Sequence, residues 1–143
     1  MNRMKIQRTL LVATVFMLGV TALMHAADFK VIANNSVTAN TVSAGDLKDV
    51  FLLDKDSLGG SHVEPVLDKG GPAHEAFVKE YLGKNDSALQ AFYRSLVFTG
   101  KASMPKTLNS DAEVVAYVAK TKGAVGYVSS TAPSEGTKTL VVK

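Results

Sequence analysis

Apolar and polar residues follow one another in short blocks, and the spacing within each block predicts a strand or a helix. Four short apolar or alternating runs next to turn residues predict β-strands: 29–33, 62–67, 124–128 and 139–142. Four segments carry apolar residues at helical spacing: 44–51, 72–82, 87–99 and 111–122. Strands separated by helices are typical of an α/β layered fold with a partly parallel sheet.

Capping residues mark where these helices begin. Ser43 followed by Asp46, and Ser110 followed by Glu113, have the spacing of a serine cap with an acidic partner. Pro72 suits a first helical position, and Asp86 or Ser87 suits the cap of the third helix. We expect that third helix to bury one complete stripe: Leu89, Phe92, Tyr93, Leu96 and Val97.

The segments between these elements are predicted to be irregular. Residues 36–42 read as a polar linker, residues 54–61 as a turn around two glycines, and residues 101–108 as a loop. Pro65 lacks a backbone donor, which favours a position on an edge strand or at a strand end.

The first 26 residues have the composition of a secretory signal peptide. Three cations and no acid precede an apolar run from Thr9 to Met24, and small residues follow at Ala26 and Ala27. An apolar run shorter than the ~20 residues of a membrane span, followed by small residues, is typical of an export signal. We expect cleavage after Ala26 and one periplasmic domain over residues 27–143; an uncleaved membrane anchor is the alternative.

Removing this segment changes the charge of the chain. The whole sequence has 16 Lys and Arg residues against 13 Asp and Glu, and Arg3, Lys5 and Arg8 lie in the segment. The remainder therefore has equal numbers of cations and acids, so the charge gives no reason to expect a nucleic-acid partner. The chain has no cysteine for a disulfide or a lipid anchor, and we expect no membrane association after cleavage.

Five runs, taken in order, resemble the phosphate-binding protein family of ABC transporters. Residues 43–52 resemble the family's Leu-Ser…Ile-Phe-Leu-Gly-Lys segment, and residues 63–66 resemble its strand ending in Pro-Val. Residues 71–77 resemble the Ser-Pro-x-Arg-x-x-Phe of short members. Residues 98–101 match Phe-Thr-Gly-Lys, and residues 123–128 nearly match Gly-Ala-Ile-Gly-Tyr-Val.

The resemblance covers residues 36–128 and implies a type II periplasmic binding-protein fold. Full-length members have two lobes that close on an oxyanion, whereas this chain has room for about one lobe. The expected fold is therefore a single-lobe α/β domain, a mixed sheet flanked by helices. The resemblance also implies an ABC transporter or a sensor protein as a partner.

The loop before the second helix is the best candidate for an oxyanion site. Gly70 and Gly71 allow close backbone approach, the helix start offers N–H groups, and Lys69 and His74 add positive charge. Family members carry Arg and then Ser-Gly-Thr here, whereas this chain has His74 at the position resembling the short branch's Arg. Asp68 beside the loop would repel an anion, so an ordinary turn is the alternative.

Other chemistry finds less support in the residues. Asn35 and Ser36 follow the first strand, where a ligand could bind, but a turn explains them equally well. Outside the leader, His62 and His74 are the only histidines, without the spacing of a metal site. No Gly-x-Ser-x-Gly motif is present, so we expect neither an enzyme nor a cofactor; a secreted hydrolase would need a serine beside His74 and a carboxylate.

The aromatic residues of the second and third helices fall at core spacing, with a shallow apolar groove for a partner as the alternative: Tyr81, Phe92, Tyr93 and Phe98. The sequence thus predicts a periplasmic solute-binding-type protein that holds phosphate or a related small oxyanion. Its predicted ligand-binding residues are Lys69, Gly70, Gly71, His74, Asn35 and Ser36. The alternative is a periplasmic interaction or sensory accessory protein that kept the fold and lost the ligand.

Overall fold

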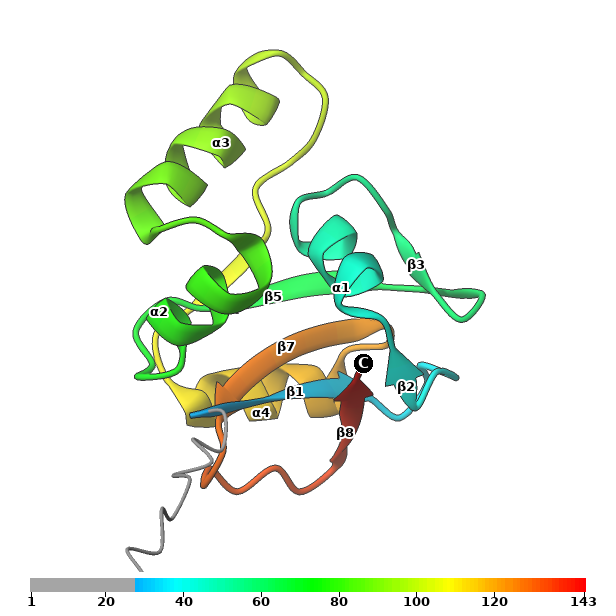
Figure 1. Cartoon of the computed structure of the whole chain (residues 1–143). Helices are drawn as coiled ribbons and strands as arrows, with labels where there is room; N and C mark the ends of the chain where they lie inside the picture. Colours follow the sequence, from blue (N-terminus) through cyan, green and yellow to red (C-terminus); the bar gives the residue numbers. More distant parts are fainter. Residues whose placement is uncertain (1–27) are drawn as a thin grey trace, which may run out of the picture.

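A computed structural model describes residues 28–143 of the chain (Figure 1). The expected signal peptide, residues 1–26, and its cleavage site lie outside the described residues. The described elements are β1 (Phe29–Asn34), β2 (Thr41–Val42), α1 (Ala44–Phe51), β3 (Ser57–Leu58), β4 (Ser61–His62), β5 (Glu64–Asp68), α2 (His74–Phe77), the π-helical segment η1 (Val78–Leu82), α3 (Asp86–Phe98), β6 (Lys106–Leu108), α4 (Asp111–Lys120), β7 (Ala124–Ser129) and β8 (Thr137–Val142).

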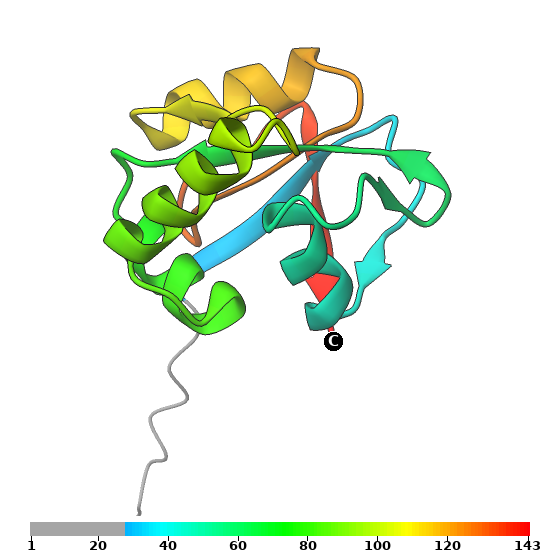
Figure 2. The same ribbon diagram turned by 90° about the horizontal axis from the view of Figure 1, so that it is seen from above.

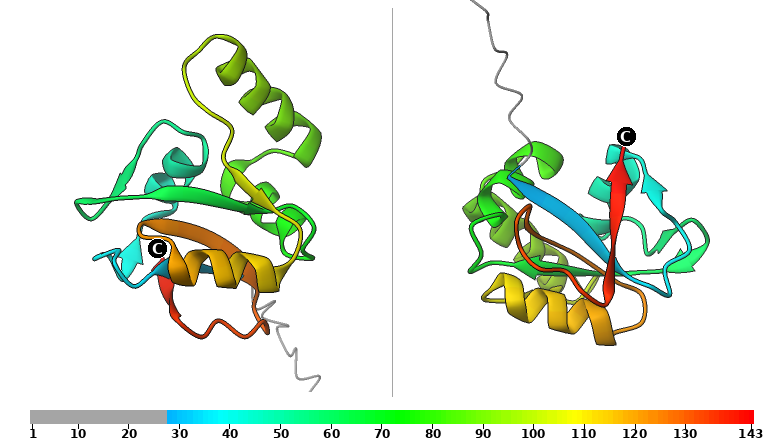
Figure 3. Two further views of the ribbon diagram at one scale, coloured as in Figure 1. Left: turned by 180° about the vertical axis from the view of Figure 1, so that it is seen from behind. Right: turned by 90° about the horizontal axis from the view of Figure 1, so that it is seen from below.

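Six strands form one mixed sheet in the order β2-β8-β1-β7-β5-β6. β1 lies between β7 and β8 and is antiparallel to both, whereas β5 is parallel to its neighbours β6 and β7 (Figure 3). β3 and β4 make a separate hairpin around Gly59 and Gly60. The predicted α/β fold, a mixed sheet flanked by helices, is confirmed.

Helices cover both faces of the sheet (Figure 2). α4 packs on one face, where Val114 and Val118 belong to a core shared with Ile32, Val66 and Val128. α1, α2, η1 and the first half of α3 cover the other face around a larger core. Because β7 lies between two helical layers, five of its six residues are buried, which explains its unbroken apolar run. Within residues 28–143, no helix is long and apolar enough to span a membrane.

The predicted serine caps of α1 and α4 are confirmed. The Ser43 hydroxyl accepts a hydrogen bond from the Asp46 amide at 3.0 Å, and the Ser110 hydroxyl accepts one from the Glu113 amide at 3.2 Å. The Glu113 carboxylate also accepts a bond from the amide of Asn109, just before the helix. Each cap satisfies amides that have no partner inside the helix.

Several boundaries differ from the predictions. The predicted linker contains β2, and the predicted loop contains β6, because each of these very short strands is defined by pairing with a distant partner. α2 begins at His74 instead of Pro72, and Asn85 caps α3 instead of Asp86 or Ser87.

Pro65 lies at the second position of β5. The prediction that it lies near a strand end is therefore right, but the alternative that its strand is an edge strand is wrong, because β5 lies between β7 and β6. Pairing with β6 starts only at Val66, so the missing donor of Pro65 breaks no bond on that side.

The predicted buried stripe of α3 is only half correct. Leu89 and Tyr93 are buried, but Val97 is 42% exposed. Phe98, one of the aromatic residues expected in the core, is 93% exposed, so its core placement is wrong. Figure 1 shows the reason, because α3 leaves the body of the domain and its last turns point away from the sheet. Helical periodicity identifies residues that share a face, but whether another element covers that face depends on the tertiary fold.

The two halves of α3 should therefore differ in what they contribute to stability. Leu89→Ala is expected to lower the free energy of unfolding by about 2–5 kcal/mol because it empties a fully buried site. Leu96→Ala, in the half-buried second part, should cost about 1 kcal/mol or less. Urea unfolding of both variants measures the difference; equal losses would contradict a projecting helix end.

Candidate functional site

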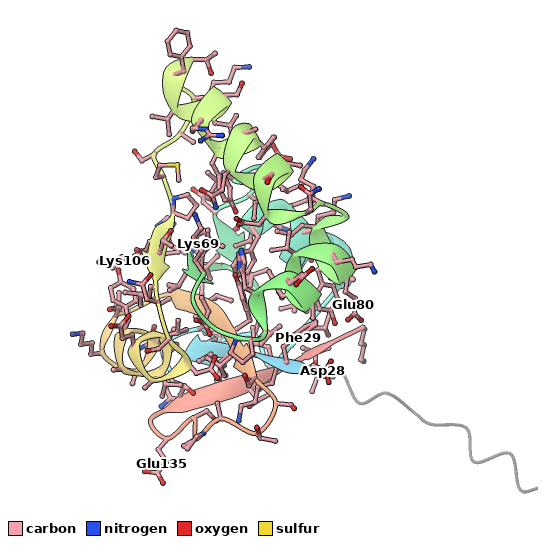
Figure 4. All side chains as sticks on the ribbon, turned by 90° about the vertical axis from the view of Figure 1, so that its left-hand side faces the viewer. Asp28, Phe29, Lys69, Glu80, Lys106 and Glu135 are labelled. Carbon is pink, nitrogen blue, oxygen red and sulfur yellow. The ribbon has the colours of Figure 1, made fainter. Side chains whose placement is uncertain are left out.

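The candidate site lies at the carboxyl-terminal end of β5. Because β5 runs parallel to β6 and β7, the three strands end at the same edge of the sheet. Residues 69–73 leave β5 there and lead into α2; Figure 4, in which Lys69 is labelled, looks onto this edge. Ligands of α/β proteins favour the crevice beyond the carboxyl ends of parallel strands.

A pocket of about 360 Å³ opens at this edge, lined by Lys69, Gly71, Pro72, His74, Glu75, Asn85 and Asp86. It brings together three of the predicted ligand-binding residues, Lys69, Gly71 and His74, and Gly70 lies on the same loop. The charged side chains of its lining, however, are one cation, Lys69, and two carboxylates, Glu75 and Asp86. The pocket is therefore not the cationic environment that would attract a phosphate.

The two glycines of this loop allow close contacts within the chain itself. A Cβ atom at Gly71 would collide with the carboxylate of Asp68, and one at Gly70 would collide with the backbone carbonyl of Asn109. The Gly71 amide donates a hydrogen bond to the Asp68 carbonyl at 3.1 Å. The space that these glycines were expected to leave for an anion is thus occupied by atoms of Asp68 and Asn109.

Asp68 itself is fully buried. Neither of its carboxyl oxygens accepts a hydrogen bond from a donor in the described part of the chain, and the carboxyl group of Asp111 is its neighbour. Burial raises the pKa of Asp68 to about 7, and Asp111 adds to the rise. Burial also acts to raise the pKa of Asp111, but hydrogen bonds with Asp68 and Ser129 outweigh it and lower that pKa. Of the two neighbouring carboxyl groups, Asp68 is therefore the one that stays protonated to the higher pH.

His74 occupies the middle of a buried hydrogen-bond chain. Its Nδ1 lies 2.5 Å from the Tyr127 hydroxyl, and its Nε2 lies 2.8 Å from a carboxylate oxygen of Asp86. Burial keeps the pKa of Tyr127 well above its usual range. Because the Asp86 carboxylate can only accept, Nε2–H donates to it, and Nδ1 of the neutral ring then accepts from the Tyr127 hydroxyl. The hydrogen bond from His74 lowers the pKa of Asp86. Both ring nitrogens are thus engaged inside the protein.

Asn35 and Ser36 lie at the other end of the strands, away from the loop that follows β5. β1 is antiparallel to β7, so the carboxyl end of β1 meets the amino end of β7 instead of the end of β5. Ser36 accepts a hydrogen bond from the Gly123 amide at 2.9 Å, and Asn35 donates one to the Gly136 carbonyl at 3.2 Å. The six predicted ligand-binding residues therefore fall into two groups, one at each end of the strands.

Sequence reasoning missed the polar groups that fill the candidate site. Tyr127 stood out only as part of a strand, and Asp86 only as a helix cap. The sequence places Asp68 beside the loop as a repelling charge, but no local pattern indicates that Asp111 is its neighbour. These contacts join residues far apart in the chain, so no local pattern reveals them.

The arrangement gives little support to other chemistry. No serine lines the pocket that holds His74 and Asp86, so the hydrolase alternative gains no support. Across residues 28–143, no three histidine or acidic side chains are placed to share a metal ion.

Solved structures similar to this chain are phosphate-binding proteins of ABC transporters. One is a putative phosphate ABC transporter substrate-binding protein with bound phosphate from Clostridium perfringens, with a TM-score of 0.62 at 14% identity, covering 80% of this chain and 44% of that one. The fold of this chain is that of about one lobe of such a protein. PstS from Borrelia burgdorferi gives a TM-score of 0.61 at 13% identity, covering 81% of this chain and 47% of its own.

An ABC-type phosphate transport receptor from Vibrio cholerae gives a TM-score of 0.53 at 12% identity, covering 80% of this chain and 46% of that one. No family model and no curated protein sequence matches. The chain thus spans less than half the length of each of these structures, and the likeness concerns the fold.

The raised pKa of Asp68 makes the free energy of unfolding depend on pH. The folded state holds the proton of this carboxyl group up to about pH 7, whereas an unfolded aspartate releases it near 3.8, so stability falls as pH rises between these values. Asp68→Asn removes the charge. The melting temperature of the variant relative to the natural protein should be higher by about 5 °C at pH 8 than at pH 4.5.

Asp54→Asn, at an exposed carboxylate, is the matched control and should show no such pH dependence. Thermal unfolding of the two variants and the natural protein at both pH values is the measurement. A difference for Asp68→Asn that is the same at pH 4.5 and pH 8 would contradict a proton held at this site.

Removing the Tyr127 hydroxyl should leave Nδ1 of His74 buried without a donor. We expect Tyr127→Phe to lower the free energy of unfolding by about 1–3 kcal/mol. Tyr117→Phe is the control, because the Tyr117 hydroxyl bonds to Glu64 in a partly exposed position and should matter less. Denaturant unfolding compares them; a loss for Tyr127→Phe no larger than the control would rule out the buried hydrogen-bond chain.

Proposed function

We propose that this chain is a periplasmic solute-binding-type lobe that acts as an interaction or sensory accessory protein and does not hold a small oxyanion on its own. The observation that carries the proposal is the carboxyl group of Asp68, which packs against Gly71 where an anion would have to approach the backbone. An anion placed there would meet a carboxyl group and an amide that already has a partner.

The electrostatics of the pocket support the same conclusion. The position that resembles the family's arginine is His74, and both of its ring nitrogens are bonded to Tyr127 and Asp86. Lys69 is then the remaining cation of the lining, opposed by Glu75 and Asp86. Phosphate is usually held by several donors and a guanidinium or a helix amino end, and the described lining offers few of these.

The size of the chain adds a second argument. The similar structures are phosphate transport proteins more than twice as long as the matched part of this chain. A lone lobe offers one wall of a two-lobed clamp, so an oxyanion bound there would keep one side in water. A transporter or a sensor protein is the class of partner that suits such a lobe.

Oxyanion binding is the second candidate, and one observation favours it. Lys69, Gly71 and His74 line one pocket at the carboxyl edge of a fold shared with phosphate-binding proteins. In this case phosphate or a related anion would contact Lys69 and the backbone of residues 69–73 from the solvent side.

Titration with anions separates the two candidates. At pH 7 we expect no heat of binding and no rise in melting temperature beyond about 1 °C on adding phosphate or sulfate to about 10 mM, compared with chloride of equal ionic strength. A site with a dissociation constant of 1 mM would add about 1.4 kcal/mol of stability under these conditions, several degrees in melting temperature.

Saturable binding below 1 mM that Lys69→Gln abolishes would overturn the proposal in favour of the second candidate. Lys120→Gln, at an exposed lysine on α4, is the control for a general loss of positive charge. In that outcome Glu75→Gln should strengthen binding, because it removes a carboxylate from the same pocket.

A further inference from the structure

The end of α3 forms a protruding apolar surface, which we call the α3 tip and define by Val97, Phe98 and Met104. These side chains are 42%, 93% and 45% exposed, and no other large apolar side chain in residues 28–143 is so exposed except Val141. Together with Ala91, Arg94 and Ser95 they line a shallow hollow of about 580 Å³. Soluble proteins rarely leave such residues grouped on the surface without a partner for them.

The exposure of the α3 tip is a property of an ordered helix end. The first half of α3 is anchored by buried Leu89 and by Tyr93, whose hydroxyl donates to the Phe51 carbonyl at 2.6 Å. At the other end, Gly100 adopts a positive φ of 70°, and the Lys101 amide bonds back to the Leu96 carbonyl at 2.9 Å. This glycine-terminated cap closes the helix, so Phe98 is held outward by the fold.

The chain segment that carries the α3 tip has only positive charges. Residues 87–110 include Arg94, Lys101 and Lys106 and no acidic residue. Among the residues that the structure describes, none of these three cations forms an ion pair. Figure 4 shows that the labelled acidic residues lie away from this end, with Glu135 at the opposite end of the molecule from α3.

We propose that the α3 tip docks on an anionic lipid surface. Apolar side chains at the extremity of a projecting helix, bordered by cations without acids, fit a bilayer whose headgroups attract the cations while Phe98 enters the interface. A second copy of this chain fits less well, since two tips packed together would bring like charges close. The inference departs from the expectation that the cleaved protein does not associate with membranes, and it is independent of the proposed function.

The shape of the α3 tip favours lipid over a protein partner. The hollow is shallow and lies at the far end of a helix that leaves the domain body (Figure 1). A flat bilayer can reach such an extremity without meeting the rest of the protein. A partner protein that buried only this small region would gain a contact smaller than a stable interface requires.

Vesicle sedimentation tests the proposal on the protein purified after export, with its N-terminus determined by mass spectrometry. We expect binding to vesicles of phosphatidylglycerol mixed with phosphatidylcholine, and binding about tenfold weaker to pure phosphatidylcholine. Phe98→Ser should weaken binding to the anionic vesicles by about tenfold through lost apolar contact. Arg94→Gln combined with Lys101→Gln should weaken it by at least as much.

Matched variants elsewhere should leave binding unchanged. Val141→Ser removes an apolar side chain that is 57% exposed on β8, and Lys48→Gln with Lys120→Gln removes two exposed cations. Unchanged melting temperatures would show that Phe98→Ser remains folded, as its exposure leads us to expect.

Three outcomes would overturn the proposal: no binding to anionic vesicles, equal binding to both kinds of vesicle, or equal losses in the tip and control variants. Self-association that Phe98→Ser abolishes, seen by sedimentation without lipid binding, would assign the α3 tip to a second copy. Capture of a negatively charged protein without lipid binding would assign it to an acidic partner.

Discussion

Burying a carboxyl group is unfavourable unless its charge is removed or paired, and Asp68 is fully buried at the end of β5. Burial raises the pKa of Asp68 to about 7, which favours its neutral form, and the neighbouring Asp111 accepts a hydrogen bond from the Ser129 amide at 3.3 Å. This arrangement links the ends of β5 and β7 to the start of α4. It also requires a residue without a side chain at position 71, so the shape of the loop follows from how this one group is accommodated.

As a result, the space at the carboxyl ends of β5 and β7 is filled by side chains of the chain itself. The loop after β5 is filled by Asp68, and the ring of His74 is held between Tyr127 and Asp86. The groups that stabilise this end of the sheet therefore belong to the chain itself. The exposed apolar surface of the domain lies elsewhere, at the end of α3.

Features decided by neighbouring residues could be predicted from the sequence, and features decided by distant pairing could not. The caps at Ser43 and Ser110 and the buried strand β7 depend on a few adjacent residues. β2 and β6 are two and three residues long, and their partners lie far along the chain. The division of the predicted ligand-binding residues had the same origin, because only the antiparallel direction of β1 separates Asn35 and Ser36 from Gly71.

The place of β1 within the sheet also bears on how the chain folds. It is the first strand of the described chain, and both of its partners, β7 and β8, are the last two. Contacts between residues so distant in sequence slow folding, since a long loop must close before they form. During synthesis the early part of the chain cannot complete its sheet until the final strands emerge. Such a topology leaves β1 without its partner strands through most of the synthesis of the chain.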